Sequence, residues 1–204
     1  MPDGFVHLHV ASGFSLQYGA SHPQALVERA AEQEMDALAL TDRNGTYGAV
    51  RFAKACQRAG IRPILGVDLA VTPTMGPLTV VEERGTSVSK PLHWGETGAR
   101  APSSTTGGGG RTPVRGGAFR DARLPRVTFL ASGRSGWAAL CRLVSATHLA
   151  GERGDPVCSL DLVAEHVAGQ DVLVLLGPAS ELGRAATLRR DDLGRAVLDR
   201  WPGT

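Results

Sequence analysis

The chain has 204 residues, of which 42% are hydrophobic and 21% are charged, and its formal net charge is +2 at pH 7. This composition supports a packed core. No apolar run approaches the roughly 18 residues of a membrane span, and the N-terminus lacks a secretory signal. We therefore expect a cytoplasmic protein that enters no membrane. The basic residues are scattered along the sequence and indicate no nucleic-acid surface, and the three cysteines lack C-x-x-C spacing, which argues against a zinc knuckle or a disulfide framework.

Residues 5–71 alternate short apolar runs with amphipathic stretches, which is the pattern of strands joined by helical crossovers into a parallel sheet. The expected elements are a strand over 5–10, a helix over 21–34, a strand over 36–40 leading into a loop over 41–45, a helix over 47–59 and a strand over 61–71. Ser21 and Gln24 have capping-box spacing, and Pro23 falls in the first helical turn. Gly60 is a suitable C-terminal cap for the second helix.

Residues 72–125 differ in composition from the rest of the chain. They are rich in Gly, Ser, Thr and Pro, and such a segment buries too little apolar surface to offset its chain entropy. We therefore predict a disordered insertion within one domain. Ordered structure is expected again as a strand over 126–131, a helix over 136–150, a helix over 159–167 capped by Ser159, a strand over 171–177 and two short helices over 179–186 and 191–201.

Three segments outside the insertion carry a family resemblance. They read FVHLHVASGFSLQYGASHPQALVERAA, ALALTDRNGTYGAVRFAKACQRAGIRPILGVDLAV and VTFLASGRSGWAALCRLVSATH. Together they resemble the N-terminal PHP (polymerase and histidinol phosphatase) domain of bacterial C-family DNA polymerase III alpha subunits, most strongly the error-prone DNA polymerase branch. The resemblance implies an α/β fold, a distorted (β/α)7 TIM-like barrel. Residues 1–204 would form a partial PHP domain, incomplete at the C-terminus, with residues 72–125 as an insertion within it.

The resemblance also implies a metal site at the strand ends. In active PHP domains the first loop supplies two histidines, and their positions here are His9 and Ala11. The other ligand positions of the family pattern are held by Tyr18, Arg43, Asp68, Arg126 and Pro178. Of all these residues, His9 and Asp68 match the family's ligand types. The resemblance therefore implies a site that has lost most of its ligands.

Four residues remain as candidate ligands of a vestigial metal site: His7, His9, Asp42 and Asp68. Each also has a structural explanation. A lone histidine on a strand is most often a hydrogen-bonded structural residue, and Asp42 can cap the loop or the next helix through its carboxylate. Asp68 can bind a cation, or it can pair with Arg43 in the space that a metal would fill.

From the resemblance we expect a fragment of a bacterial error-prone DNA polymerase or DNA polymerase III alpha subunit, acting in DNA replication or repair synthesis. The family is a DNA-directed DNA polymerase, a nucleotidyltransferase, but this chain lacks the polymerase catalytic domains. Its own role would be structural and free of cofactors, with the remaining polymerase domains or replication accessory proteins as partners and DNA contacted indirectly. One alternative is a stand-alone phosphoesterase or 3'-5' exonuclease that uses the four candidate ligands with Zn, Mn or Mg. Another is a free-standing interaction module that regulates a polymerase.

Overall fold

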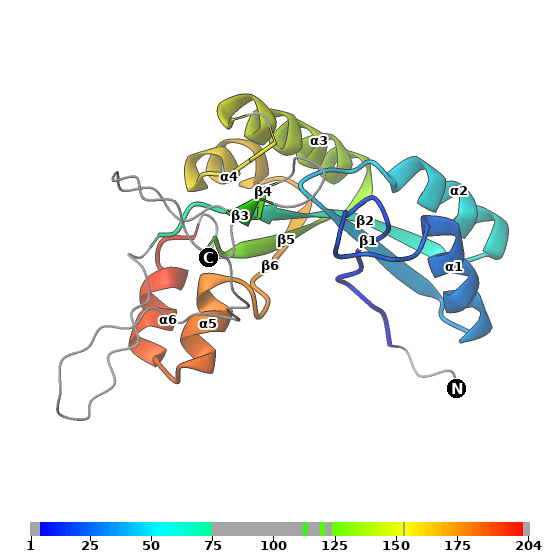
Figure 1. Ribbon diagram of the computed structural model, residues 1–204, viewed down its shortest axis with the longest axis horizontal. Coiled ribbons are helices and arrows are strands. Elements are labelled where there is room, and N and C mark those ends of the chain that lie inside the picture. The colour runs from blue at the N-terminus through cyan, green and yellow to red at the C-terminus, as the bar shows by residue number, and fades with distance from the viewer. Residues whose placement is uncertain (1–4, 75–111, 114–118, 121–123, 153, 202–204) are drawn as a thin grey trace.

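The computed structural model describes residues 5–74, 112–113, 119–120, 124–152 and 154–201. The fold is mixed α/β, with a four-stranded sheet in the order β1-β2-β5-β6 and a separate two-stranded ladder, β3-β4. The elements in chain order are α1 Pro23–Glu32, β1 Ala37–Arg43, α2 Ala49–Ala59, β2 Arg62–Ala70, β3 Thr112–Pro113, β4 Phe119–Arg120, β5 Arg126–Ala131, α3 Gly133–Ala150, α4 Leu160–Val167, β6 Val172–Leu175, α5 Glu181–Thr187 and α6 Asp191–Leu198. Figure 1 shows α3 and α4 along one side of the sheet, with α1 and α2 beside β1 and β2.

The first predicted strand, residues 5–10, is wrong as a regular strand, although the segment runs beside β1. The backbone N–H of Ala39 donates to the carbonyl of His7 at 3.0 Å, and that of Thr41 donates to Val10 at 2.8 Å. In the return direction, the N–H of Val10 donates to the Thr41 hydroxyl at 2.9 Å. A side chain therefore replaces a backbone acceptor, and this interrupts the ladder that a strand requires.

The parallel sheet predicted for residues 5–71 is confirmed for strands β1 and β2, whereas the strands later in the chain pair antiparallel. Strands β1 and β2 pair in parallel, as expected for strands joined by the single helix α2. In contrast, β5 pairs antiparallel with both β2 and β6. The connection from β5 to β6 contains two helices, α3 and α4, and each helix reverses the chain direction, so the strand that follows the pair runs opposite to the strand before it.

The helix predictions are confirmed, with one correction at a cap. The N-cap residue of α1 is His22, not Ser21, and Gln24 donates to Glu28 at 2.9 Å, so the predicted capping box is wrong. Helix α2 ends at Gly60, whose φ of 72° is the left-handed conformation that glycine adopts without strain. Ser159 caps α4 by accepting from the N–H of Leu162. The predicted loop over 41–45 begins later, because β1 continues to Arg43.

The core lies between the helices and one face of the sheet, which we call the helix face. Leu38 and Leu40 of β1 pack with α1 and α2, while Val67 of β2 and Phe129 of β5 pack with α3 and α4. Because side chains alternate along a strand, the residues between them point to the opposite face, which we call the inner face. The polar residues Thr41, Arg43, Asp68, Arg126 and Thr128 lie on this inner face.

Most of the insertion predicted to be disordered, residues 72–125, lies outside the described residues. Within it, Thr112–Pro113 and Phe119–Arg120 pair as the antiparallel ladder β3-β4. Residues 72–74 follow β2 and reach α5, where the N–H and hydroxyl of Thr74 donate to the carboxylate of Glu181. Among the described residues, no helix is long and apolar enough to cross a membrane.

Burial holds the cysteine thiols in their neutral form. It raises the pKa of Cys56 to about 11 and also raises the pKa of Cys141 and of Cys158. Since the thiolate is the reactive form, we expect the native chain to react slowly with Ellman's reagent at neutral pH, and the three thiols to react rapidly once denaturant unfolds the chain. Fast labelling of Cys56 in the native chain, located by mass spectrometry, would contradict this expectation.

Candidate functional site

Strand pairing brings three inner-face residues together at one end of the sheet. Arg43 of β1 lies directly opposite Asp68 of β2, and Asp68 lies opposite Thr128 of β5. Asp68 is 3% exposed, so its carboxylate needs a partner within the protein. This end of β1 and β2 is the edge at which α/β proteins build their sites.

The partner of Asp68 is Arg126, the first residue of β5. Its Nε donates to Asp68 Oδ2 at 2.7 Å, and its Nη2 donates to the Asp68 carbonyl at 2.6 Å and to Asn44 Oδ1 at 2.9 Å. Arg43 is a secondary partner, with Nε 3.9 Å from the same carboxylate oxygen. The expected Arg43–Asp68 pair is thus present, but the shorter contact to Asp68 comes from Arg126. Arg126 also occupies a position where the family pattern expects a metal ligand.

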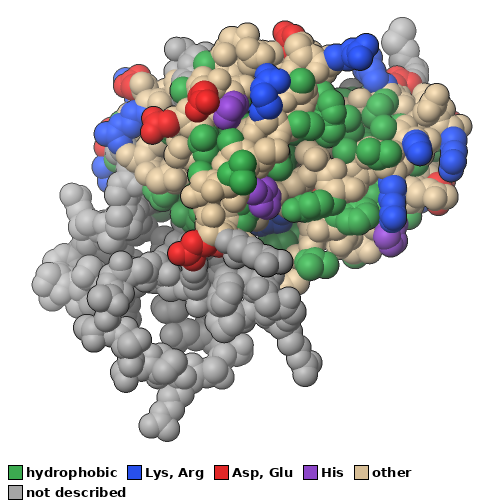
Figure 2. All heavy atoms as spheres, turned by 90° about the horizontal axis from the view of Figure 1, so that it is seen from above, with side chains coloured by type: hydrophobic (Ala, Val, Ile, Leu, Met, Phe, Trp, Pro, Cys, Tyr) green, Lys and Arg blue, Asp and Glu red, His purple; other side chains and the backbone are tan. Residues whose placement is uncertain are grey.

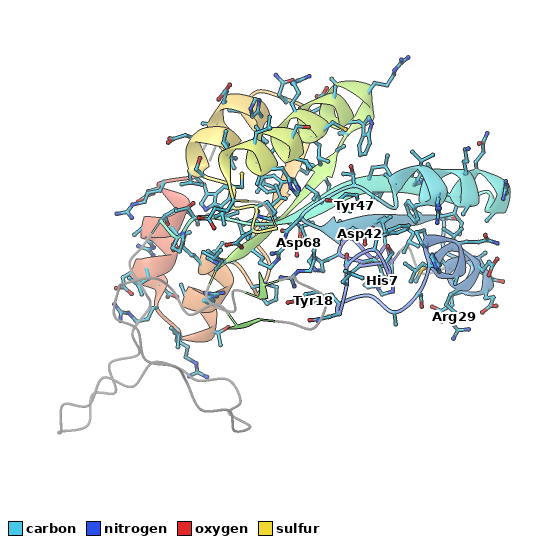
Figure 3. The ribbon with its side chains drawn as sticks, turned by 45° about the horizontal axis from the view of Figure 1, so that its top comes forward. His7, Tyr18, Arg29, Asp42, Tyr47 and Asp68 are labelled. Carbon is cyan, nitrogen blue, oxygen red and sulfur yellow. The ribbon has the colours of Figure 1, made fainter. Side chains whose placement is uncertain are left out.

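A third lost ligand position belongs to the same cluster. The guanidinium carbon of Arg43 lies 3.5 Å from the centre of the Tyr18 ring, which is the stacked geometry of a cation–π contact. Tyr18 therefore contacts Arg43, and Arg43 approaches Asp68; Figure 3 labels Tyr18 and Asp68. We call Tyr18, Arg43, Asp68 and Arg126 the arginine cluster. Next to Pro178, another replaced position, the carbonyl of Ala179 accepts the Arg126 backbone N–H at 3.0 Å.

The two candidate histidines have different surroundings. His9 Nδ1 lies 2.7 Å from the hydroxyl of Thr128, and Thr128 is the residue opposite Asp68, so His9 reaches the edge of the arginine cluster. The ring of His7 lies edge-on to Phe5, with ring centres 4.7 Å apart. Both histidines are exposed. Of the two, only His9 is brought near Asp68.

Asp42 is buried on the helix face and anchors the first loop. Its carboxylate accepts the backbone N–H of Ser12 at 2.7 Å, the Ser12 hydroxyl at 2.9 Å and the Ser15 hydroxyl at 2.7 Å. Ser15 in turn accepts the backbone N–H of Arg43 at 2.9 Å. The carboxylate thus holds a loop in place, which agrees with a structural role, although the partners lie in the preceding loop and not in the next helix.

We expect Asp42→Ala to lower the free energy of unfolding by about 2 kcal/mol, because it leaves buried donors of Ser12 and Ser15 without their charged acceptor. Urea denaturation followed by circular dichroism measures the change. The matched control is Asp36→Ala, because Asp36 is exposed, and a substitution of that kind changes stability by about 0.5 kcal/mol or less. Equal effects of the two substitutions would contradict the anchoring role of Asp42.

Asn44 joins the arginine cluster to α3, and the sequence patterns did not single it out. Its backbone N–H donates to the Asp68 carbonyl at 2.8 Å, its side-chain oxygen accepts from Arg126, and its carbonyl lies 2.6 Å from Nε2 of His148. Its φ is 57°, a left-handed conformation that asparagine tolerates better than most residues. The Asn-Gly pair at 44–45 is a turn signal, and it is the one sequence feature that could have identified this position.

The candidate ligands do not converge on one point in the described part of the chain. Among the residues described, no group of three or more His, Cys, Asp or Glu side chains is placed to hold a metal ion. Asp42 and Asp68 point to opposite faces of the sheet, and Asp68 is paired with arginine. The geometry therefore offers an ion pair at the strand ends, where a metal site needs several converging anionic or imidazole ligands.

The fold and this strand-end cluster define an α/β domain, and the chain belongs to the PHP domain family, whose model matches residues 7–202. Over 166 residues it is 34% identical to the error-prone DNA polymerase of Mycolicibacterium paratuberculosis, a match that covers 81% of this chain and 12% of that protein. It is 32% identical to the error-prone DNA polymerase of Nocardia farcinica, over 93% of this chain and 16% of that protein. The DNA polymerase III subunit alpha of Saccharopolyspora erythraea is 30% identical, over 93% of this chain and 14% of that protein.

These matches confirm the family that the sequence motifs indicate. The chain is a PHP domain homologous to part of the error-prone DNA polymerases and DNA polymerase III alpha subunits. It spans only 12% to 16% of the length of these relatives, so their complete activity is not an attribute of this chain alone.

Proposed function

We propose that this chain is a structural PHP domain of a bacterial C-family DNA polymerase, and that an internal ion-pair cluster replaces the metal cluster of its active relatives. The observation that carries the proposal is the arginine cluster. Residues at three positions where the family pattern expects ligands contact Asp68 or one another: Arg126 at 2.7 Å, Arg43 at 3.9 Å and Tyr18 stacked on Arg43. A carboxylate that is already neutralised by guanidinium groups has little attraction left for a divalent cation.

We also propose that the sheet belongs to a distorted TIM-like barrel. The helices α1 to α4 all pack against one face of the sheet, as the outer helices of a barrel do. The inner face carries the polar cluster at its strand ends. The remaining domains of a polymerase, or replication accessory proteins, are the proposed partners in the cytoplasm, and DNA synthesis would be the work of those other domains.

A metal-dependent phosphoesterase or exonuclease is the second candidate, because His9 lies next to Thr128 and so near Asp68. Hydrolysis of p-nitrophenyl phosphate and degradation of a 3'-labelled oligonucleotide, each with Mn²⁺ or Zn²⁺, distinguish the two functions. If the function is structural, the unmodified chain should show no more turnover than the double variant Asp68→Asn with His9→Ala. Turnover by the unmodified chain that this double variant abolishes would favour the phosphoesterase.

A further inference from the structure

Charge is unevenly distributed among the helices. Helix α2 contains Arg51, Lys54 and Arg58 and no acidic residue, and α3 contains Arg134 and Arg142 and no acidic residue. The other helices all carry acidic residues, so α2 and α3 are the described helices whose charged side chains are all basic. Figure 2 shows lysine and arginine side chains at both ends of the visible face, and one group lies toward the right, the side on which α2 lies in Figure 1.

The basic residues of α2 form one exposed stripe. Arg51, Lys54 and Arg58 are spaced i, i+3 and i+7, which places them on the same side of the helix over about 10 Å of its axis, and all three are exposed. The neighbouring helix α1 carries Glu28 and Glu32, but Glu32 is paired with Arg29 at 2.8 Å. Within the described part of the chain, none of these three residues forms an ion pair, although the Arg51 guanidinium lies 5.5 Å from the centre of the Phe14 ring. The stripe therefore presents positive charge to solvent, a pattern suited to a chain of phosphates.

A pocket opens at the segment that leads into α2. Its volume is about 300 Å³, and it lies between the segment before α2 and the second half of α3, lined by Gly45, Thr46, Tyr47, Val144, Ser145 and His148. Tyr47 is 63% exposed, and Figure 3 shows it on the segment that leads into α2. The lining combines an aromatic ring with hydroxyl groups and an imidazole, which are groups that stack on a nucleobase and hydrogen-bond to its edge.

We propose that this surface binds single-stranded nucleic acid, with phosphates along the α2 stripe and one base stacked on Tyr47 at the pocket. A single strand fits better than a duplex, because the bases of a duplex are stacked on each other and cannot reach a side chain in a pocket. The surface contains no member of the arginine cluster, although His148 in the pocket lining contacts Asn44, which accepts from Arg126. The inference is tested apart from the structural function proposed above, because metal titration and hydrolysis of p-nitrophenyl phosphate test that function without nucleic acid.

The experiment measures fluorescence anisotropy of a labelled oligothymidylate with the complete chain over a range of salt concentrations. Substituting Arg51→Gln, Lys54→Gln and Arg58→Gln together should weaken binding about tenfold or more. It should also reduce the slope of log affinity against log salt by about 2, since each phosphate contact of a single strand contributes about 0.7. Tyr47→Ala should weaken binding by about tenfold, the size expected for loss of one stacked base, while Tyr47→Phe should bind as the unmodified chain does.

The matched control removes three positive charges elsewhere, by Arg29→Gln, Arg189→Gln and Arg195→Gln. It has the same net charge as the α2 variant and should retain affinity and salt dependence if location matters. Circular dichroism checks that each variant is folded. The inference is overturned if the unmodified chain fails to bind at low salt, if both triple variants weaken binding equally, if Tyr47→Ala has no effect, or if a duplex of the same sequence binds as tightly as the single strand.

Discussion

Replacing Arg126 with Met is expected to lower the free energy of unfolding of this PHP domain by about 3 kcal/mol. The Asp68 carboxylate is 3% exposed, and the contact from Arg126 Nε at 2.7 Å is its closest ion pair. Removing one member of a buried pair leaves an uncompensated charge, which is the reason for the large effect. The substitution also removes the hydrogen bonds that Arg126 donates to Asn44 and to the Asp68 carbonyl. Urea denaturation measures the change.

Two further variants test the cause of this effect. Arg43→Met should lower stability by about 1 kcal/mol or less, because Arg43 lies 3.9 Å from the carboxylate and is more exposed than Arg126. The double variant Asp68→Leu with Arg126→Met should recover most of the loss, since an apolar pair removes the unpaired charge. If the double variant were less stable than Arg126→Met alone, the unpaired carboxylate would not be the source of the destabilisation.

Local sequence patterns predicted the helices and most strands, because amphipathic spacing and caps act within a few residues. Gly60 and Ser159 end and begin their helices as predicted. The failures depend on distant partners. The segment 5–10 has the composition of a strand, yet the Thr41 hydroxyl replaces a ladder acceptor, and no local pattern reveals that contact. The antiparallel direction of β5 relative to β2 likewise depends on a connection that spans residues 71–125.

The candidate site was predictable as a set of substituted positions but not as a set of contacts. The family pattern identified Arg43 and Arg126 separately, and the prediction paired Asp68 with Arg43 alone. Which arginine comes closer depends on the register between β2 and β5, where Arg126 lies opposite Ala70, and on the turn at Asn44 that accepts its Nη2. Such geometry is set by tertiary packing, which spacing in the sequence does not encode.

The same limit applies to surface charge. A net charge of +2 and scattered basic residues suggested no nucleic-acid surface. However, the net charge is a sum over the whole protein surface, whereas a ligand binds to one face and responds to the charge of that face. Among the described helices, α1, α4, α5 and α6 carry acidic residues, whereas α2 and α3 lack them. Because the charges belong to whole helices, the asymmetry is already contained in the sequence once its charged residues are assigned to the predicted helices one by one.

Calorimetric titration with Mn²⁺ or Zn²⁺ is expected to show no specific binding to the unmodified chain. Metal binding should appear only when the family's ligands are restored at the replaced positions, including Arg126. A guanidinium about 4 Å from a divalent ion opposes binding by about 8 kcal/mol at an effective dielectric constant of about 20. Two guanidinium groups approach Asp68 in this fold. The triple variant Ala11→His, Tyr18→Asp and Arg43→His adds ligands but keeps Arg126, so we expect it to remain without metal.

Adding Arg126→His to that triple variant removes the closer guanidinium and supplies another imidazole at the strand end. This quadruple variant should bind stoichiometrically, and the metal should replace the two arginines as the partner of Asp68, so that binding raises the melting temperature. The pair of variants differs only at Arg126, which makes that residue the tested cause of exclusion. Tight binding by the unmodified chain, lost in His9→Ala or Asp68→Asn, would contradict this exclusion and show that the metal site is intact. In that case the metal ion would have to displace the Arg126 guanidinium from the Asp68 carboxylate, against their 2.7 Å contact.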